Sequence, residues 1–358
     1  MLTNGRNTMS PRKAPRILWV LSCGLFASSV PAVTIPTVPV GNPGNPGELS
    51  GEGAGGSGPT ALVGSVSYTF RMGKFEITAG QYADFLNAVA RTDTYGLYHP
   101  EMDITVNPAN PYGCNIVRTG SPGDYQYSVA PEWANRPADF VSWANAARFA
   151  NWMHNGQPVG VQDLSTTEDG SYFLNGAVDF SSLMAVTRKP DATWVLPTED
   201  EWYKSAYHKN DGPTGNYWDY PTSTDIPPSN VLVEPTDPGN NATFGAPTPR
   251  FTIGSPYWKT EVGAHENSKS PYGTLDQGGN VWELTETGIG GSTRVIRGGS
   301  FNGNLDQLHA EYRVGHGSPV NADVGFGFRL ALVPEPLTAM MFVIGAGGLA
   351  SRRGQNRR

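Results

Sequence analysis

Residues 279–332 constrain the fold of this chain more than any other stretch. They begin with Gly-Asn-Val-Trp-Glu and later read Arg-Val-Ile-Arg from Arg294, followed by paired glycines at 298 and 299. Alternation of apolar and polar residues indicates a strand, and paired glycines indicate a tight turn. The stretch therefore predicts strands joined by tight turns.

The glycine and proline content excludes a mainly helical fold. The 358 residues include 44 glycines and 30 prolines, which are poor residues for helix interiors. Hydrophobic residues make up 38% of the chain and aromatic residues 11%, which is enough for a sizeable core. We therefore expect a loop-rich body with a core of Trp, Tyr and Phe side chains.

The charge distribution argues against nucleic-acid partners. The net charge is -7, although residues 1–32 carry four basic and no acidic groups and the C-terminal end is also basic. The part between the two ends is therefore more acidic than the net charge of the whole chain indicates. Such a body repels nucleic acids and anionic membrane surfaces.

The N-terminus carries the pattern of a secretory signal peptide. Arg12, Lys13 and Arg16 precede an apolar run over residues 17–27, and small residues follow up to position 32. This run is too short to span a bilayer, which needs about 20 residues. We expect residues 1–32 to direct export, and residues 33–61, rich in Pro and Gly, to form a flexible linker.

The C-terminus resembles the PEP-CTERM sorting signal of Gram-negative bacteria. Within residues 333–358, a Pro-Glu-Pro triplet precedes a short apolar helix and a cluster of arginines. The residues that carry the signal are Pro334, Glu335, Pro336, Arg352 and Arg353. A short apolar segment followed by cations stops in the inner membrane with its arginines in the cytoplasm. The resemblance implies cleavage by an exosortase and release to the cell surface; a permanent C-terminal anchor is the alternative.

Three sequences predict capped helices. Thr78 and Gln81 form one capping box, Thr198 and Glu201 form another, and Ser142 can cap a third helix. The residues expected to face the core are Tyr82, Phe85, Leu86, Val89, Ala146, Phe149, Ala150, Met153, Trp202 and Ala206. Residues 64–72 predict a strand and residues 172–187 a hairpin.

Two carboxylates at the start of the predicted helix after Thr198 admit a second interpretation. Glu199 and Glu201 could act as a pair in acid–base chemistry. We favour a role in capping, because acidic residues in the first turn interact well with the helix dipole.

Several motifs together resemble the formylglycine-generating enzyme, or sulfatase-modifying factor, family. They occupy residues 73–78, 194–202, 279–283, 297–301 and 327–330. The resemblance implies a single α+β domain over residues 62–332, with a fold related to C-type lectins, long loops and little regular secondary structure.

The resemblance also implies two calcium sites. In the first, the side chains of Asp276 and Glu283 and the carbonyls of Gly279 and Val281 would supply four of the oxygen ligands that calcium prefers. The alternative is that Glu283 pairs with an arginine in the core, either Arg297 or Arg329.

The second implied calcium site is less complete. It would use Asn230 and the carbonyl of Val231, together with a later side chain for which Glu234, Asp237 and Asn240 compete.

The enzymes of this family use two cysteines that bind copper. Aligned on the Gly-Gly-Ser-Phe turn, those positions fall on Gly303 and near Leu308, and Cys114 lies elsewhere in the chain. Because Cu(I) requires sulfur ligands, we expect neither copper nor formylglycine-generating activity and assign no catalytic residue. With no basic neighbour in sequence, Cys114 is expected to be a half-buried apolar residue.

Polar residues after this turn could line a ligand cleft. The candidates are Asp306, His309, Glu311, Arg313 and His316. The sequence thus favours an exported, non-catalytic binding module stabilised by calcium, with a carbohydrate or another surface polymer as ligand. The alternative is a metal-dependent oxidoreductase in which His309, Glu311 and His316 hold iron.

Overall fold

The computed structural model describes residues 1–2, 32–245 and 250–334 of the chain. Residues 3–31 of the predicted signal peptide and residues 335–358 of the predicted sorting signal lie outside the described residues. None of the helices in the described part is long and apolar enough to cross a membrane.

Five α-helices are present among the described residues. They are α1 (Ala79–Val89), α2 (Pro131–Ala134), α3 (Trp143–His154), α4 (Phe180–Ala185) and α5 (Glu199–Tyr207). Short 3-10 helices occur at η1 (Glu52–Ala54), η2 (Pro100–Met102) and η3 (Leu305–Leu308). The predicted caps are confirmed: Thr78 and Thr198 form capping boxes with Gln81 and Glu201, and the Ser142 side chain accepts a hydrogen bond from the Asn145 amide.

The strands form two four-stranded and two two-stranded sheets. The first sheet has the order β1 (Thr37–Val40), β4 (Phe70–Gly73), β12 (Ala331–Leu332), β7 (Trp194–Val195). The second has the order β10 (Val314–Gly317), β9 (Thr293–Arg297), β8 (Trp282–Ile289), β11 (Phe326–Gly327). The small sheets pair β2 (Glu48–Ser50) with β3 (Ala61–Val63), and β5 (Ile116–Thr119) with β6 (Gln126–Val129). The hairpin of β8 and β9 is the one that the sequence predicts.

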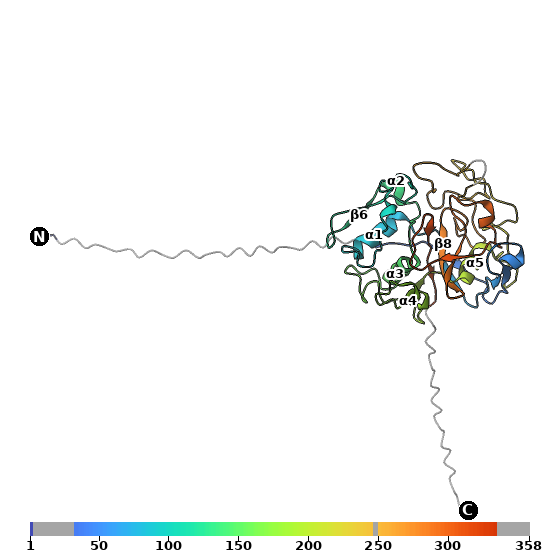
Figure 1. The fold of residues 1–358 in the computed structure, drawn as a ribbon, viewed down its shortest axis with the longest axis horizontal. Helices are drawn as coiled ribbons and strands as arrows, with labels where there is room; N and C mark the ends of the chain where they lie inside the picture. Colours follow the sequence, from blue (N-terminus) through green and yellow to red (C-terminus); the bar gives the residue numbers. More distant parts are fainter. Residues whose placement is uncertain (3–31, 246–249, 335–358) are drawn as a thin grey trace, which may run out of the picture. The chain divides into compact units, whose positions relative to one another are not determined.

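Aromatic side chains build the main core, as the composition predicts. Phe85 of α1 and Phe149 of α3 have ring centroids 5.1 Å apart, and Trp152 packs against both rings. All ten residues expected to face the core are buried. Figure 1 shows α1 to α4 on one side of the body, with β8 and α5 on the other.

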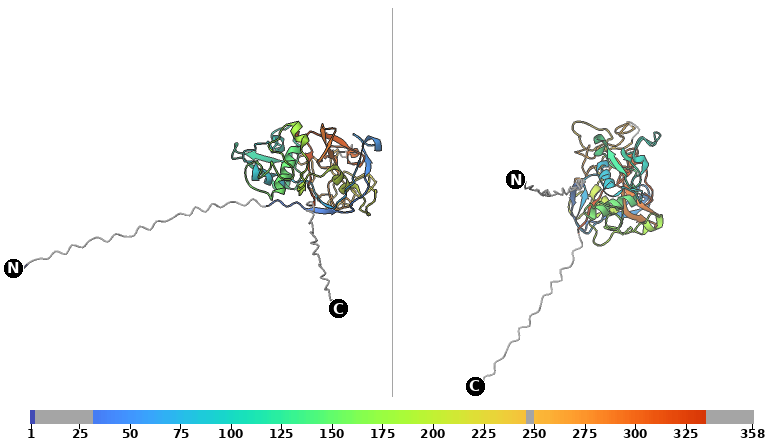
Figure 2. Two further views of the ribbon diagram at one scale, coloured as in Figure 1. Left: turned by 90° about the horizontal axis from the view of Figure 1, so that it is seen from below. Right: turned by 90° about the vertical axis from the view of Figure 1, so that its left-hand side faces the viewer.

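The segment predicted as a flexible linker, residues 33–61, is instead part of the folded body. β1 pairs with β4 over its whole length, and β2 and β3 form a hairpin. Figure 2 shows this blue segment crossing from the side of α1 toward the side of α5.

Close backbone packing explains the glycines between β2 and β3. At Gly58, φ is +80° and a Cβ atom would lie 1.7 Å from the carbonyl oxygen of Arg313. The Arg313 amide donates a hydrogen bond to the carbonyl of Ser57. A glycine-rich composition is common to flexible linkers and to segments packed backbone against backbone, so the linker prediction was wrong here.

Two predicted elements are shorter or different. The strand predicted over residues 64–72 contains only β4, Phe70–Gly73. The hairpin predicted over residues 172–187 contains α4, because the Asp179 side chain accepts a hydrogen bond from the Ser182 amide and caps a helical turn.

Candidate functional site

Glu283, a predicted calcium ligand on β8, is fully buried and paired with Arg329. Its two carboxylate oxygens accept hydrogen bonds from Nε and Nη2 of Arg329 at 2.5 and 2.6 Å. Oε2 also accepts one from Nε1 of Trp202 at 2.7 Å. Of the two arginines that the sequence offered as alternatives, the structure selects Arg329.

Glu76, which the sequence analysis did not single out, lies in the same charged cluster. It is buried, and neither of its carboxylate oxygens has a hydrogen-bond partner among the described residues. Burial raises the pKa of Glu76 well above its ordinary value; the charge of Asp276 raises it further, whereas Arg329 lowers it. Burial also raises the pKa of Asp276 to about 6.

The charges in this cluster do not balance. When ionised, the carboxylates of Glu76, Asp276 and Glu283 outnumber the single guanidinium of Arg329 by two negative charges. Burying unpaired charge is costly, and a divalent cation would neutralise this excess. The unpartnered oxygens of Glu76 and the hard oxygen donors therefore fit calcium.

The loop that begins at Asp276 has an unusual backbone. Asp276, Gly279 and Asn280 all have positive φ angles, of 60°, 89° and 56°. At Gly279 a Cβ atom would lie 2.1 Å from the carbonyl oxygen of Thr243, so only glycine fits there. Within the described residues, no group of three or more His, Cys, Asp or Glu side chains is arranged to hold a metal. Main-chain carbonyls and water would have to complete a calcium shell at this loop.

The second implied calcium site is not assembled to the same degree. Asn230 is buried and donates a hydrogen bond to the carbonyl of Phe244, while the Val231 side chain is exposed. Of the competing side chains, Asp237 is buried and already accepts hydrogen bonds from Asn241 and Ser268. The second calcium site stays a prediction.

Three of the predicted cleft residues do come together. Asp306, His309 and Glu311 line a cavity of about 300 Å³ with Tyr312 and residues 55–57 of the β2–β3 loop; we call it the histidine cleft. Nδ1 of His309 lies 3.7 Å from Oε2 of Glu311. The histidine cleft thus presents a histidine ring beside carboxylates.

The other two predicted cleft residues are placed differently. Arg313 is buried and does not line the cleft, because Glu199 binds it: Nη2 of Arg313 lies 2.8 Å from Oε2 of Glu199. The backbone of His316 belongs to β10, and its side chain lies outside the described part of the structure.

The carboxylates of α5 have structural partners. Glu199 bridges Arg297 and Arg313, and Glu201 accepts two hydrogen bonds from Arg188 at 2.9 and 2.8 Å. These ion pairs and the capping box occupy both side chains, which excludes the interpretation as a free acid–base pair.

Of the two positions where the sequence predicts the copper cysteines of the family, Gly303 and a residue near Leu308, the second lies in closed apolar surroundings. Leu308 is fully buried in an apolar cluster with Tyr220, Ala242 and Phe244. Cys114 is buried in the main core, and burial raises its pKa to about 12, which disfavours the thiolate that a metal would need.

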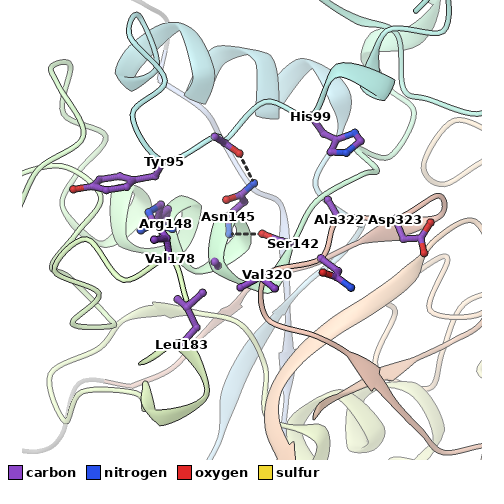
Figure 3. A pocket seen from close by; sticks show the side chains of 13 residues that line it. Tyr95, His99, Ser142, Asn145, Arg148, Val178, Leu183, Val320, Ala322 and Asp323 are labelled. Carbon is purple, nitrogen blue, oxygen red and sulfur yellow. Dashed lines mark hydrogen bonds between the residues drawn. The ribbon is translucent and has the colours of Figure 1, made fainter. Parts of the chain in front are cut away.

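A second cavity, which the sequence analysis missed, lies beside α3 (Figure 3). It has a volume of about 460 Å³, and we call it the α3 cavity. Its polar lining includes Tyr95, His99, Ser142, Asn145, Arg148 and Asp323. One feature of the sequence could have indicated this cavity: the polar residues Asn145 and Arg148 lie one turn apart beside the apolar face of the helix.

Comparison with known proteins agrees with this fold. Treponema denticola variable protein 1 is similar at 21% identity and a TM-score of 0.50, covering 86% of this chain and 98% of that chain. CarF is similar at 18% identity and a TM-score of 0.47, covering 84% of this chain and 99% of that chain. PvdO from Pseudomonas aeruginosa is similar at 16% identity and a TM-score of 0.45, covering 83% of this chain and 93% of that chain. A search of curated proteins finds no match.

The family comparison covers almost the whole folded body. The sequence pattern described as "Sulfatase-modifying factor enzyme 1-like domain" matches residues 46–333. This range includes the β2–β3 hairpin and all five helices. The chain therefore belongs to the sulfatase-modifying factor enzyme 1-like domain family, with its loop-rich α+β fold.

Proposed function

We propose that this protein is an exported, non-catalytic member of its family that binds a ligand and is stabilised by calcium. The observation that carries the proposal is the burial of Leu308 in an apolar cluster. The alignment of the Gly-Gly-Ser-Phe turn assigns the second copper cysteine of the family's oxidases to a position near Leu308. Without sulfur ligands the copper chemistry of those enzymes has no basis here.

Calcium has a candidate site around Glu76. The residues that would hold the ion are Glu76 and Asp276 with the carbonyls of Gly279 and Val281. Glu283 would share its carboxylate with Arg329. The bound ion would neutralise the excess of negative charge and would tie the loop after Asp276 to the segment before α1.

The histidine cleft supports a binding role for a polar ligand. His309, Glu311 and Asp306 offer hydrogen-bonding groups at the surface of the cavity, and Tyr312 adds an aromatic ring. A carbohydrate or another surface polymer presents complementary hydroxyl groups.

The ends of the chain support export and surface sorting. The signal peptide over residues 1–32 would direct the chain out of the cytoplasm of a Gram-negative bacterium. An exosortase would then act near Pro334, Glu335 and Pro336, so that membrane contact is limited to the C-terminal segment.

Elemental analysis tests the calcium site and the absence of catalytic metal together. The full chain would be expressed in a Gram-negative host, purified from the exported fraction, and measured by mass spectrometry of bound elements with and without a chelator. We expect one to two calcium ions per chain and a lower thermal midpoint after chelation. Glu76→Gln should weaken calcium retention, whereas Glu101→Gln, in η2 and bonded to Asn107 and Asn110, should not.

Two outcomes would contradict this proposal. If the purified protein contains no calcium and its thermal midpoint is unchanged by the chelator, the proposed calcium site is wrong. Stoichiometric iron or copper would instead support the alternative of a metal-dependent oxidoreductase, and His309 would be the first residue to replace.

A further inference from the structure

The α3 cavity is lined by polar groups that the protein itself holds in place. Ser142, Asn145 and Arg148 are all buried; Ser142 caps α3, and the other two lie within the helix. Figure 3 shows them facing the loop that carries Tyr95 and His99, with Val320 and Asp323 on a third side. Val178 and Leu183 complete the lining, so the cavity lies where four chain segments meet.

Neighbouring side chains hold Arg148 in place, but not all of its N–H groups have hydrogen-bond partners in the described part of the chain. Its Nε and Nη2 donate to the two carboxylate oxygens of Glu168 at 2.7 and 3.0 Å, and the Tyr95 ring stacks on the guanidinium at 4.5 Å. Nη1 has no hydrogen-bond partner among the described residues. Nη2 also donates to the carbonyl of Ala177 at 2.9 Å, so the two N–H groups of Nη1 are the unused ones. A rigid guanidinium with unused N–H groups is a donor prepared for a ligand.

The side chains of Asn145 and His99 each have one polar atom in a hydrogen bond and one left for a ligand. Nδ2 of Asn145 donates to the carbonyl of Gly96 at 3.0 Å, which leaves Oδ1 as an acceptor. Nδ1 of His99 accepts a hydrogen bond from the Glu101 amide, and the ring stacks on Phe140 at 5.1 Å. Because Nδ1 accepts, Nε2 carries the ring proton and is a donor.

The charge of the cavity selects a class of ligand. Arg148 is neutralised by Glu168, so the remaining carboxylate at the rim is that of the exposed Asp323. The lining thus offers both donors and acceptors at a site with no excess positive charge, and Val178 and Val320 supply exposed apolar surface. Vicinal hydroxyl groups, which donate and accept at once, match this lining, and the apolar ring face of a sugar matches the two valines.

We propose that the α3 cavity binds a neutral sugar residue of a polysaccharide. This inference rests on the proposed function in one respect, namely that the domain binds rather than converts its ligand. A volume of about 460 Å³ is within the usual range of ligand pockets and accommodates one or two sugar residues.

Saturation-transfer NMR and calorimetry with a panel of methyl glycosides test the site. The panel contains the methyl glycosides of glucose, galactose, mannose and N-acetylglucosamine, with methyl glucuronide as the anionic comparison. We expect at least one neutral glycoside to bind the full-length protein. His99→Phe, which keeps the ring stacking but removes the Nε2 donor, and Asp323→Ala should each weaken binding about tenfold, the loss of about one hydrogen bond.

His154→Phe is the matched control, because it makes the same substitution at a histidine that lines neither cavity. It should leave the affinity unchanged. His309→Phe makes the same substitution in the histidine cleft and distinguishes the two cavities. Weakening by His309→Phe and not by His99→Phe would overturn the α3 cavity as the site while leaving the proposed binding function intact. Absence of binding by the whole panel at millimolar concentration, or tighter binding of the glucuronide than of any neutral glycoside, would overturn the proposed ligand class. Failure of the proposed function itself would appear separately, as bound iron or copper in the elemental analysis.

Discussion

At the scale of single residues, buried charges are the main risk to the stability of this protein. Lys259 and Asp139 are both completely buried, with Nζ 2.6 Å from Oδ2, and the Lys259 ammonium lies 4.8 Å from the centre of the Phe301 ring. The second oxygen of Asp139, Oδ1, has no partner in the described residues.

We expect Lys259→Met to lower the free energy of unfolding by about 3–5 kcal/mol, because it leaves the Asp139 carboxylate buried without its counter-ion. Urea denaturation followed by tryptophan fluorescence measures the change. The double variant Lys259→Met/Asp139→Leu is the control and should recover much of the loss. A single variant as stable as the parent would show that Asp139 is not charged in the folded protein.

The contribution of Lys204 to stability is expected to change with pH. It is buried, donates a hydrogen bond to the carbonyl of Asn42 at 2.8 Å, and has its pKa lowered by burial from 10.5 to about 8. Between those values the unfolded chain binds more protons at this site than the folded one, so its contribution to stability rises with pH. Lys204→Met removes this contribution. The stability of the parent should therefore rise relative to that of the variant as pH increases from 8 to 9.5, and a constant difference would contradict the assignment.

At the scale of elements, the glycine-rich loop between β2 and β3 shows how backbone packing selects a residue. Gly58 and Gly44 have almost equal φ angles, +80° and +81°, but only Gly58 has a backbone atom against the place of a Cβ. The two positions therefore separate the cost of a positive φ from the cost of a collision.

We expect Gly44→Ala to destabilise the protein by about 1 kcal/mol, from the positive φ alone. Gly58→Ala should cost more, about 3 kcal/mol, because the loop must also move away from Arg313. Thermal denaturation of the two variants, measured side by side, gives the comparison. Equal shifts in the thermal midpoint would mean that the loop is not held against residues 311–313 in solution.

At the scale of the whole molecule, the N-terminal segment joins the two sides of the body. Val33, Ile35 and Val40 are buried, and Gln157, after α3, exchanges hydrogen bonds with the backbone of Val33. The segment thus contributes both to a sheet and to the main core.

Replacing residues 33–41 with a Gly/Ser sequence of equal length should therefore lower the stability by about 4 kcal/mol or more, the value of burying three aliphatic side chains. The thermal midpoint of the purified protein measures this loss. An unchanged midpoint would restore the interpretation of this segment as a linker.

The sequence by itself determined the features that depend on neighbours close in the chain. The capping boxes of Thr78 and Thr198 act over three residues, the β8–β9 hairpin joins adjacent strands, and the core faces of α1 and α3 follow from helical spacing. Family membership also followed from short motifs. These features need no knowledge of the rest of the fold.

Only the tertiary structure decided which distant groups meet. Arg329 pairs with Glu283, and Glu199 binds Arg313 outside the predicted cleft. The unpartnered carboxylate of Glu76 lies in the same cluster as Asp276. Each of these contacts joins residues far apart in the chain, and alternation or helical spacing carries no signal for them. The physical reason is that a buried charge must find a partner wherever the packed chain places one, so the outcome depends on the whole fold rather than on any local pattern.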